Sequence, residues 1–351
     1  MNVLSLFDGI SCAKLALDEC GFRVDSYFAS EIEPNAMKVA TANHPMIIEI
    51  GDVSKISYKD GVLYTPNKSY CVGHIDLLCG GSPCTNFSSI GYANGMTTGD
   101  VDILSLEQYL ALKESGAVFR GQSYLFWEYC RLLKEVTPDY FLLENVAMAK
   151  KWEDIITQAL GVEPIKINSS LLSAQNRPRL YWTNIEGVQI PVDANIILDD
   201  ILSANADDRD VSYCLTVQRS FPRMMEKYGY IPKRFNAYNA SEIKGKACAL
   251  SRGSMITSSC ATLLFVRAED GAHTVSRGIL NGEYKTPLED GRYNIRKLDL
   301  TEIERLQNLP DGYTNVAGVS EQKRTEMIGN GWTVHVISHI FSFMEEENNG
   351  N

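Results

Sequence analysis

The sequence predicts an α/β fold in which helices cover both faces of a mostly parallel sheet, with a second, smaller domain inserted late in the chain. Within residues 1–185, short apolar runs alternate with amphipathic stretches in the order strand, helix, strand, helix, which is typical of a parallel sheet. The stretch 191–292 breaks this alternation and is rich in Ser, Asn, Gly and Tyr. With 351 residues, the chain is long enough for about two or three globular units.

Short apolar runs locate the strands of this sheet. We expect strands at about residues 3–7, 24–30, 46–50, 75–80, 140–144 and 165–171. Amphipathic stretches predict helices at residues 14–20, 34–42, 125–135 and 152–160. The second of these begins with Pro34, and proline is favoured at the first position of a helix. After the inserted region, a helical pattern returns at residues 300–307.

One connection is much longer than the few residues that usually join elements of a compact domain. It runs from Cys84 to Gly121, contains Gly91, Gly95 and Gly99, and includes a helix-like stretch at residues 103–113. Loops of this length usually have a function. We therefore expect a lid here.

Composition excludes several classes of protein. No segment reaches the roughly 18 uncharged apolar residues of a membrane span, and the amino terminus lacks the features of a signal peptide. The nine cysteines are an odd number, and no two have C-x-x-C spacing, so we expect free thiols and no metal site. These observations predict a cytoplasmic protein.

Charge is unevenly distributed along the chain. The net charge is −11, yet residues 211–297 contain 14 Lys or Arg against 7 Asp or Glu, a local charge of +7 that leaves −18 elsewhere. A basic module on an acidic chain is typical of a protein that contacts a phosphate backbone with one face. Chance clustering on a solvated surface is the alternative interpretation.

The end of the first strand has the position of a ligand site. Phe7-Asp8-Gly9-Ile10-Ser11 follows that strand, at the edge where open parallel sheets bind ligands. The loop lacks G-x-G-x-x-G, which disfavours pyrophosphate ligands such as NAD or FAD. Glu31 can accept ribose hydroxyls, and Asp52 can accept the amino group of adenine. The pattern fits adenosine joined to an amino acid, although acidic residues here often only cap a helix.

Four further residues suggest chemistry at the same edge. Cys84 ends a Gly-Gly-Ser-Pro turn, which is too polar and too bent to suit the alternative, a buried structural cysteine. Glu144 ends an apolar run, where a carboxylate either caps a helix or acts in the crevice. Arg177 and Arg179 are two residues apart, so on an extended segment both point to one side, where they can hold a carbonyl oxygen or a phosphate.

These residues belong to a larger ordered set. In chain order it comprises Phe7-Asp8-Gly9, Gly81-Ser82-Pro83-Cys84, Glu144-Asn145-Val146, Gln175-x-Arg177-x-Arg179, Arg296-x-Leu298-x-x-x-Glu302-x-x-Arg305-Leu306-Gln307-x-x-Pro310 and Gly329-Asn330-Gly331-x-x-Val334. The set resembles the cytosine-specific DNA methyltransferases that act at carbon 5, and the resemblance covers about residues 1–185 and 293–345. Residues 5–56 look most like the catalytic domain of the animal de novo enzymes. Other features, including Gln307-x-x-Pro310, look like the bacterial and phage enzymes.

The resemblance implies a Rossmann-like class I methyltransferase that uses S-adenosyl-L-methionine and modifies a flipped cytosine in double-stranded DNA. Cys84 would add to carbon 6 of the cytosine. Glu144 would hold the 4-amino group and protonate ring nitrogen 3, while Arg179 and Arg177 would bind the ring carbonyl.

The resemblance also implies which residues contact S-adenosylmethionine. They are Phe7, Asp8, Gly9, Ile10, Glu31, Ile32, Asp52, Val53, Pro83, Leu125, Asn330, Gly331 and Trp332. Two neighbouring amides, Asn145 and Gln175, are expected to be scaffolding.

The implied domain order is a catalytic and cofactor-binding domain at residues 1–188, a target-recognition domain at 189–292, and a return segment at 293–351 that completes the small domain and then the catalytic one. The basic region falls largely within the second. A bacterial or phage-infected cell is the expected setting, either in restriction-modification or as an orphan enzyme, and a monomer is favoured. Two departures from the family pattern are a segment 96–118 longer than the usual catalytic loop, and Gly121-Gln122-Ser123 where many members carry an arginine-serine pair.

Three other functions remain open. A transfer-RNA cytosine-5 methyltransferase has the same fold, but the Cys-Phe-Thr segment typical of that branch is absent. A catalytically inactive paralogue that only binds DNA or a partner is disfavoured by the intact Cys84, Glu144 and Arg179. A sulfonium cofactor that carries a group larger than methyl is also compatible with the sequence.

Overall fold

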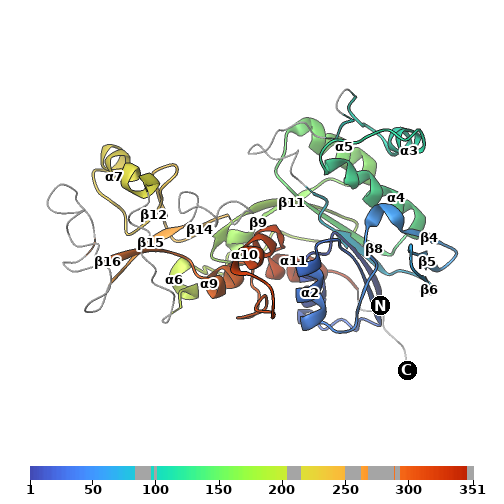
Figure 1. Cartoon of the computed structure of the whole chain (residues 1–351), viewed down its shortest axis with the longest axis horizontal. Helices are drawn as coiled ribbons and strands as arrows, with labels where there is room; N and C mark the ends of the chain where they lie inside the picture. Colours follow the sequence, from blue (N-terminus) through green and yellow to red (C-terminus); the bar gives the residue numbers. More distant parts are fainter. Residues whose placement is uncertain are drawn as a thin grey trace. The chain divides into compact units, whose positions relative to one another are not determined.

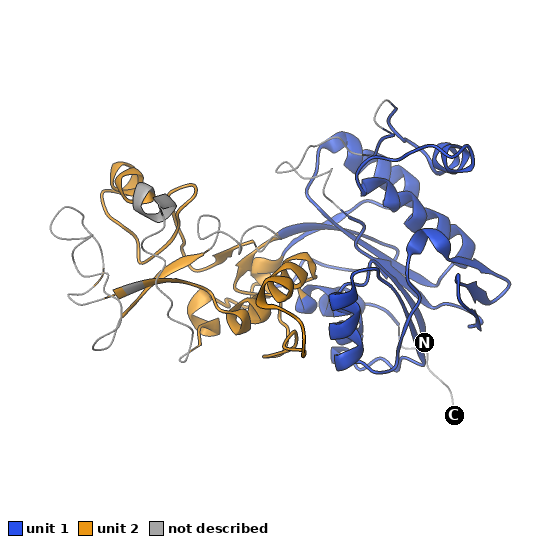
Figure 2. Cartoon of the chain, in the orientation of Figure 1, with its two compact units in different colours: residues 1–168, 178–192, 334–351 blue, residues 169–177, 193–333 orange. Residues whose placement is uncertain are grey.

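The computed structural model describes residues 1–83, 96–98, 101–203, 215–249, 262–267, 288 and 293–345. The chain divides into two compact units (Figure 2). Unit 1 comprises Met1–Asn168, Pro178–Val192 and Val334–Asn351, and unit 2 comprises Ser169–Arg177 and Asp193–Thr333. The chain therefore passes between the units four times. In contrast to the expected boundaries, residues 169–177 belong to unit 2.

Unit 1 is built on a seven-stranded sheet with the order β3-β2-β1-β7-β8-β11-β9 (Figure 1). The strands are β1 (Asn2–Leu6), β2 (Ser26–Ser30), β3 (Ile47–Glu49), β7 (Leu77–Gly80), β8 (Tyr140–Val146), β9 (Ile165–Asn168) and β11 (Pro178–Thr183). The first five strands in chain order pair in parallel, whereas β11 runs antiparallel to both β8 and β9. The amino end of β11 therefore lies at the same edge as the carboxyl ends of the parallel strands.

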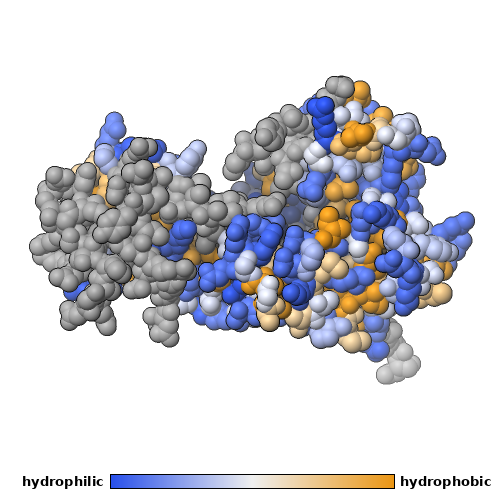
Figure 3. Space-filling view, in the orientation of Figure 1, coloured by the Kyte–Doolittle hydropathy of each residue, from blue (hydrophilic) through white to orange (hydrophobic). Residues whose placement is uncertain are grey.

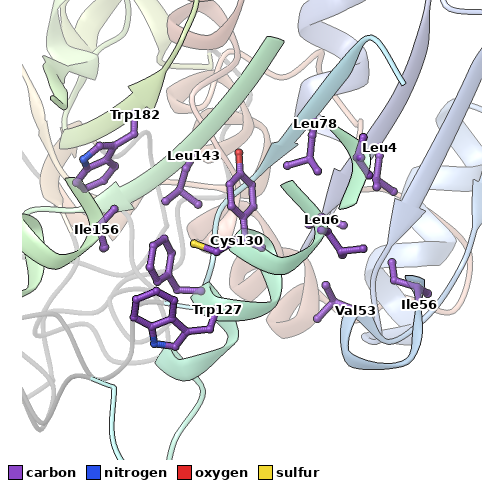
Figure 4. Close-up of a cluster of buried hydrophobic side chains, with 14 of the residues drawn as sticks. Leu4, Leu6, Val53, Ile56, Leu78, Trp127, Cys130, Leu143, Ile156 and Trp182 are labelled. Atoms are coloured by element: carbon purple, nitrogen blue, oxygen red, sulfur yellow. The ribbon is translucent and has the colours of Figure 1, made fainter. Parts of the chain in front are cut away.

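Helices cover both faces of this sheet. They are α1 (Cys12–Glu19), α2 (Pro34–Asn43), α3 (Leu106–Glu114), α4 (Phe126–Val136), α5 (Lys150–Leu160) and α11 (Val334–Phe341). On one face, Leu6, Leu78 and Leu143 of the strands pack with Trp127 of α4 and Ile156 of α5 (Figure 4). The residues that point to the other face, among them Val3, Tyr27 and Leu77, are equally buried. A sheet buried on both faces explains why its strands appear in the sequence as continuous apolar runs.

Several elements were not expected from the sequence. A small antiparallel sheet comprises β4 (Ser57–Lys59), β5 (Val62–Tyr64) and β6 (Ser69–Cys71), strands too short to give a visible alternation. Its first turn contains Asp60 and Gly61, both with positive φ, as two-residue hairpin loops require. The strand expected at 165–171 stops at Asn168 and continues as the 3-10 helix η3 (Ser169–Leu171).

Unit 2 has its own apolar core. Its four-stranded sheet has the order β13-β12-β15-β16, with β12 (Arg234–Asn236), β13 (Ser241–Glu242), β15 (Leu263–Arg267) and β16 (Tyr293–Lys297) all antiparallel. Phe235, Phe265 and Ile295 of these strands pack with Phe221 and Met224 of α7 (Leu215–Tyr228). The other elements are α6 (Leu198–Ile201), α9 (Leu300–Leu306), α10 (Glu321–Asn330), and the parallel pair β10 (Gln175–Asn176) and β14 (Ala247–Cys248).

The described surface is largely hydrophilic in the view of Figure 3, with apolar side chains interspersed. Exposed large apolar residues include Ile32, Met46 and Val118, which are far apart in the sequence. None of the helices in the described part of the chain is both long enough and apolar enough to span a membrane.

Gly80, the last residue of β7, provides a test of the packing between β1 and β7. A Cβ atom at this position would lie 2.7 Å from the backbone oxygen of Leu6 and 3.2 Å from its Cβ. Forcing an extra methyl group into a packed site typically costs about 1–3 kcal/mol. We expect Gly80→Ala to lower the free energy of unfolding by that amount in urea denaturation. The control, Ser57→Ala on exposed β4, should change it by less than about 0.5 kcal/mol. Equal stability of the two variants would contradict this packing.

Candidate functional site

The predicted site residues of unit 1 gather at the carboxyl edge of the parallel sheet. Phe7 follows β1, Glu31 follows β2, and Ser82 follows β7. Glu144 lies near the end of β8, and Arg179 lies near the start of the antiparallel β11. This arrangement follows from strand direction alone, because parallel strands end at one edge and an antiparallel strand begins there.

The turn after β1 has an unusual backbone. Phe7, Gly9 and Ser11 all have positive φ, at 56°, 62° and 60°. Two of the three are not glycine, and such conformations persist only where the surrounding contacts hold them. Here the amide of Asp8 donates to the backbone oxygen of Ser30 (3.2 Å), and the amide of Gly9 donates to Glu31 Oε2 (2.9 Å). The end of β2 therefore holds the turn in place, with Ile10 buried behind it.

The carboxylate of Asp8 is engaged within this turn. It accepts a hydrogen bond from Tyr27 Oη (2.6 Å) and one from Ser11 Oγ. Burial raises the pKa of Asp8, although these hydrogen bonds act in the opposite direction. The side chain thus helps to shape the turn, and a direct cofactor contact by Asp8 stays a prediction.

Glu31 organises the chain after β2. Its carboxylate accepts from three backbone amides, those of Gly9 (2.9 Å), Ile32 (2.7 Å) and Glu33 (2.8 Å). An ionised carboxylate has about four acceptor positions, so room remains for about one more donor rather than for both ribose hydroxyls in full. The side chain of Ile32 is 65% exposed.

Asp52 caps a 3-10 helix, as the alternative interpretation of the sequence allowed. Its Oδ1 accepts from the amide (2.9 Å) and the hydroxyl (2.8 Å) of Ser54 at the start of η1 (Val53–Lys55). Burial would raise the pKa of Asp52, but the hydrogen bonds from Ser54 and the charge of Lys55 lower it overall. Its Oδ2 lies 3.6 Å from Lys55 Nζ, so it keeps the capacity to accept another donor.

Glu49 is a candidate site residue that the sequence analysis missed. It is the last residue of β3, and both of its carboxylate oxygens are buried without a hydrogen-bond partner among the described residues. Burial, followed by the charges of Asp8 and Glu31, raises the pKa of Glu49 to about 8. A glutamate in the apolar run Ile47–Ile50 was the available signal, the same signal that drew attention to Glu144.

Asn145 links β8 to the turn that precedes Cys84. Its Nδ2 donates to the backbone oxygen (3.2 Å) and the hydroxyl (3.1 Å) of Ser82. Pro83 accepts from Ser123 Oγ (3.3 Å), which begins η2 (Ser123–Leu125). Cys84 itself lies outside the described residues. The position of the turn relative to β8 is nevertheless set by a buried amide, the scaffolding role expected for Asn145.

Glu144 and Arg179 form an ion pair across the antiparallel strands β8 and β11. Arg179 Nε lies 2.9 Å from Glu144 Oε1, and the two side chains are only 14% and 11% exposed. A partly buried carboxylate needs such a partner. The pair places a carboxylate and a guanidinium side by side at the edge that carries the Cys84 turn.

The expected substrate contact of Arg177 is not supported by the structure. Arg177 is 3% exposed, and its Nη1 and Nη2 donate to the backbone oxygen of Gly329 (both 3.1 Å), while Nη2 also donates to that of Gly331 (2.9 Å). The expectation assumed one continuous extended segment. In fact β10 ends at Asn176 and β11 begins at Pro178, so Arg177 lies between strands and has partners different from those of Arg179.

The remaining predicted cofactor residues belong to unit 2. Asn330 ends α10, and Gly331 and Trp332 follow it. Within unit 2, Gln307 Nε2 donates to the backbone oxygen of Ile328 (2.9 Å), and Gln175 Nε2 donates to that of Leu306 (3.3 Å). Arg177 and Gln307 thus hold the loop that carries the last motif, while Gln175 binds the end of α9 and acts as scaffolding there.

One group of possible metal ligands occurs among the described residues. His74, Asp76 and Asp139 bring ligand atoms within 4.8 Å of one another. His74 Nε2 already lies 2.9 Å from Asp139 Oδ2, and Asp76 accepts from the amide of Asn2. The group lies near the amino end of β7, at the opposite edge from the site.

Comparison with known proteins decides the family. A family model described as C-5 cytosine-specific DNA methylase matches residues 1–108 and 111–346. The chain belongs to this family. The resemblance drawn from the sequence motifs is thereby confirmed.

This methyltransferase is similar over nearly its full length to curated bacterial enzymes. Type II methyltransferase M.NlaX of Neisseria lactamica is 24% identical, with 98% of this chain and 96% of that protein covered. Type II methyltransferase M1.ScrFI of Lactococcus lactis subsp. cremoris is also 24% identical, with 98% and 78% covered. Orphan methyltransferase M.SPRI of Bacillus phage SPR is 30% identical over 53% of this chain and 38% of that protein.

Solved structures confirm the predicted fold class of the methyltransferase. The S. pombe Dnmt2 methyltransferase has a TM-score of 0.60 at 18% identity, with 97% of both chains covered. The Entamoeba histolytica methyltransferase EhMeth has a TM-score of 0.62 at 12% identity, with 98% of this chain and 97% of that chain covered. The α/β methyltransferase architecture is therefore shared.

Glu49 should make the stability of the methyltransferase depend on pH. Because the folded-state pKa is raised, the folded protein keeps a proton that the unfolded chain releases, so the free energy of unfolding falls as pH rises from the ordinary value of 4.5 towards about 8. Glu49→Gln removes the ionisable group, so this fall in the free energy of unfolding with rising pH should disappear. We expect urea denaturation to show the variant gaining stability over the wild type between about pH 5.5 and about pH 8.5. The exposed control Glu163→Gln should show no such trend, and a pH-independent gain for Glu49→Gln would contradict the assignment.

The structural role of Arg177 predicts a loss of stability on its removal. Arg177→Met leaves the backbone oxygen of Gly329 buried without this donor, which should cost about 1–3 kcal/mol in the free energy of unfolding. Arg177→Lys, which keeps a charge but loses the fork of donors, should cost less. Chemical denaturation measures both. If Arg177→Met kept the stability of the wild type but lost turnover, this structural role would be contradicted and substrate binding by Arg177 would be supported.

Proposed function

We propose that this methyltransferase transfers a methyl group from S-adenosylmethionine to carbon 5 of a cytosine in double-stranded DNA, through a covalent adduct of Cys84 at carbon 6. The observation that carries the proposal is the Glu144–Arg179 pair at the carboxyl edge of the sheet. Through Asn145, the strand that bears Glu144 is joined to the turn that leads into Cys84.

The acidic edge of the sheet fits S-adenosylmethionine. The buried carboxyl of Glu49 has no hydrogen-bond partner among the described residues. The charges of nearby Asp8 and Glu31 contribute to raising its pKa. Such an edge suits a ligand with hydroxyls and positive charge and disfavours phosphates. When bound, S-adenosylmethionine supplies a methyl group on a positively charged sulfur.

The residues that would hold S-adenosylmethionine surround this edge. Glu31 would accept a ribose hydroxyl, and Asp52 would accept the adenine amino group through Oδ2. The other residues of unit 1 proposed to line the site are Phe7, Asp8, Gly9, Ile10, Ile32, Val53, Pro83 and Leu125. A contribution from Asn330, Gly331 and Trp332 of unit 2 stays a prediction of the resemblance.

The Glu144–Arg179 pair places two groups that the chemistry needs at one edge of the sheet. Carbon 5 of cytosine is a weak nucleophile, so a thiolate of Cys84 must first form a bond to carbon 6 and push an electron pair towards carbon 5. Glu144 would deliver a proton to ring nitrogen 3, and Arg179 would bind the ring carbonyl. Carbon 5 would then bond to the methyl group as the methyl–sulfur bond breaks and leaves its electron pair on sulfur. Carbon 5 would next lose its proton to a base or water, and ring nitrogen 3 would give its proton back to Glu144. The returning electron pair breaks the bond to Cys84.

Two observations favour double-stranded DNA as the substrate. The curated relatives named above are type II and orphan methyltransferases. Residues 211–297 carry a local charge of +7 on an otherwise acidic chain, which suits contact with a phosphate backbone. Because carbon 5 is unreachable inside a duplex, the cytosine must be flipped out. We place this reaction in the cytoplasm of a bacterial or phage-infected cell.

Methylation in a host tests the function. Expression in a bacterium that lacks DNA methylation, followed by sequencing with single-base detection of 5-methylcytosine, should reveal methylation at one defined sequence motif. Cys84→Ser, purified to confirm that it is folded, should give none, because serine is a far weaker nucleophile towards carbon 6.

Either of two results would contradict the proposal. Unmethylated DNA combined with methylated cytosine in RNA would exclude DNA as the substrate. Normal methylation by Cys84→Ser would remove Cys84 from the mechanism.

A further inference from the structure

Glu128 of α4 is a buried charge that the proposed mechanism does not use. Its side chain is 0% exposed, and its carboxylate accepts from Tyr109 Oη and Lys113 Nζ of α3. On its other side it pairs with Arg131 of α4, with Arg131 Nε at 2.7 Å and Nη2 at 2.6 Å. Helix α3 packs against α4 (Figure 1), so this network fastens the two helices together.

The two cations of the network also hold the turn that follows Asp52. Arg131 Nη2 donates to the backbone oxygens of Val53 (3.2 Å) and Ile56 (2.9 Å). Lys113 Nζ donates to that of Ser54 (3.3 Å). Three backbone oxygens of residues 53–56 are therefore held by side chains of α3 and α4.

A second carboxylate extends the network past this turn. Arg131 Nη1 donates to Glu135 Oε1 (2.6 Å), and Glu135 Oε2 accepts from the amide of Tyr58 in β4 (2.9 Å). With two cations and two carboxylates, the network is balanced in charge. Burial would raise the pKa of Glu128, but the charge of Arg131 and the hydrogen bonds from Lys113 and Tyr109 lower it overall, so Glu128 stays ionised.

Buried ion pairs are an expensive way to gain stability, because desolvation offsets most of the attraction. A short 3-10 helix already capped by Asp52 has no need of one. What the network adds is a fixed geometry between three parts of unit 1: the helix α3, which belongs to the long segment after Cys84, the helix α4, and the turn after Asp52.

We propose that α3 is a positioning element for the cofactor pocket, in which Lys113 and the Glu128–Arg131 pair fix the adenine side of the pocket and couple it to the segment after Cys84. This inference rests on the proposed binding of S-adenosylmethionine beside Asp52. Lys113, Tyr109 and Glu128 are positioning residues, since they act through the backbone of residues 53–56 and touch neither substrate. This would explain why the segment 96–118, which contains α3, is longer than the usual catalytic loop.

Aromatic packing strengthens the connection between α3 and the start of α4. The rings of Tyr109, Phe119 and Tyr124 form a cluster, with centroids 5.1 Å apart for Tyr109 and Phe119, 4.6 Å for Phe119 and Tyr124, and 6.2 Å for Tyr109 and Tyr124. Tyr124 lies in η2, and the charges of Asp52 and Glu128 contribute to raising its pKa after the larger effect of burial.

The test compares Lys113→Met with a matched variant of the same type. Lys113→Met removes the ammonium that joins Glu128 to Ser54 while keeping the aliphatic stem. The control Lys134→Met removes an exposed lysine of α4 that lies outside the network. Calorimetric titration with S-adenosylhomocysteine reads binding without turnover. We expect about tenfold weaker binding for Lys113→Met, the effect of losing one charge-assisted hydrogen bond, and no change for the control.

Kinetics and hydrogen exchange separate positioning from a general loss of structure. At saturating S-adenosylmethionine, kcat of Lys113→Met should stay within about twofold of the wild type while KM for S-adenosylmethionine rises. Lys113→Arg should restore most of the binding. Backbone amides of residues 106–114 should exchange more slowly when S-adenosylhomocysteine is added to the wild type, and less so in Lys113→Met.

A milder variant covers the case in which Lys113→Met does not fold. Tyr109→Phe removes only the hydroxyl that donates to Glu128 and should weaken binding in the same direction by a smaller factor. Unchanged binding and unchanged exchange in a folded variant would overturn the proposal. Failure of the wild type to bind S-adenosylhomocysteine would instead contradict the proposed function.

Discussion

The direction of one strand, β11, determines which side chains can meet at the site. The five parallel strands bring their carboxyl ends to a single edge, but a sheet of that kind delivers only the residues that follow a strand. By running antiparallel between β8 and β9, β11 starts at this edge and brings Arg179 to Glu144. The scaffold around it serves the same edge, since Asn145 secures the turn before Cys84 and Glu31 secures the turn after β1.

The buried carboxyl groups of unit 1 are of two kinds, those with a cationic partner and those without one. Glu128 and Glu144 have cationic partners, which offset the cost of burying a carboxylate. Glu49 has neither a cation nor a hydrogen-bond donor among the described residues, and burial favours its neutral form. The paired carboxylates can therefore stay ionised inside the fold, whereas an unpaired acid remains at the edge proposed to receive a positively charged ligand. Such residual frustration is common where a protein is built to bind.

Much of the fold was predictable from the sequence because both faces of the sheet are buried, which leaves apolar runs that are easy to recognise. The positions of Glu144 and Arg179 also followed from simple rules about strand ends. The role of Arg177 did not, since the rule that alternate residues share a side fails where β10 stops and β11 starts. The partners of Glu128 in α3, Lys113 and Tyr109, are separated from it by 15 and 19 residues, and no local pattern indicates these contacts.

The place of α11 in unit 1 has a consequence for how the protein is made. Five of its eight residues are buried, and it packs on α1. Within it, the backbone oxygen of Ser338 accepts from Cys20 Sγ (3.2 Å), and the hydroxyl of Ser338 donates to Glu19 Oε2 (2.6 Å). Among the described residues, the last helix in chain order thus packs on the first. Contacts so distant in sequence form slowly. During synthesis, the apolar face of α1 therefore lacks this partner until residues 334–341 have been made, and chaperones can bind it in that period.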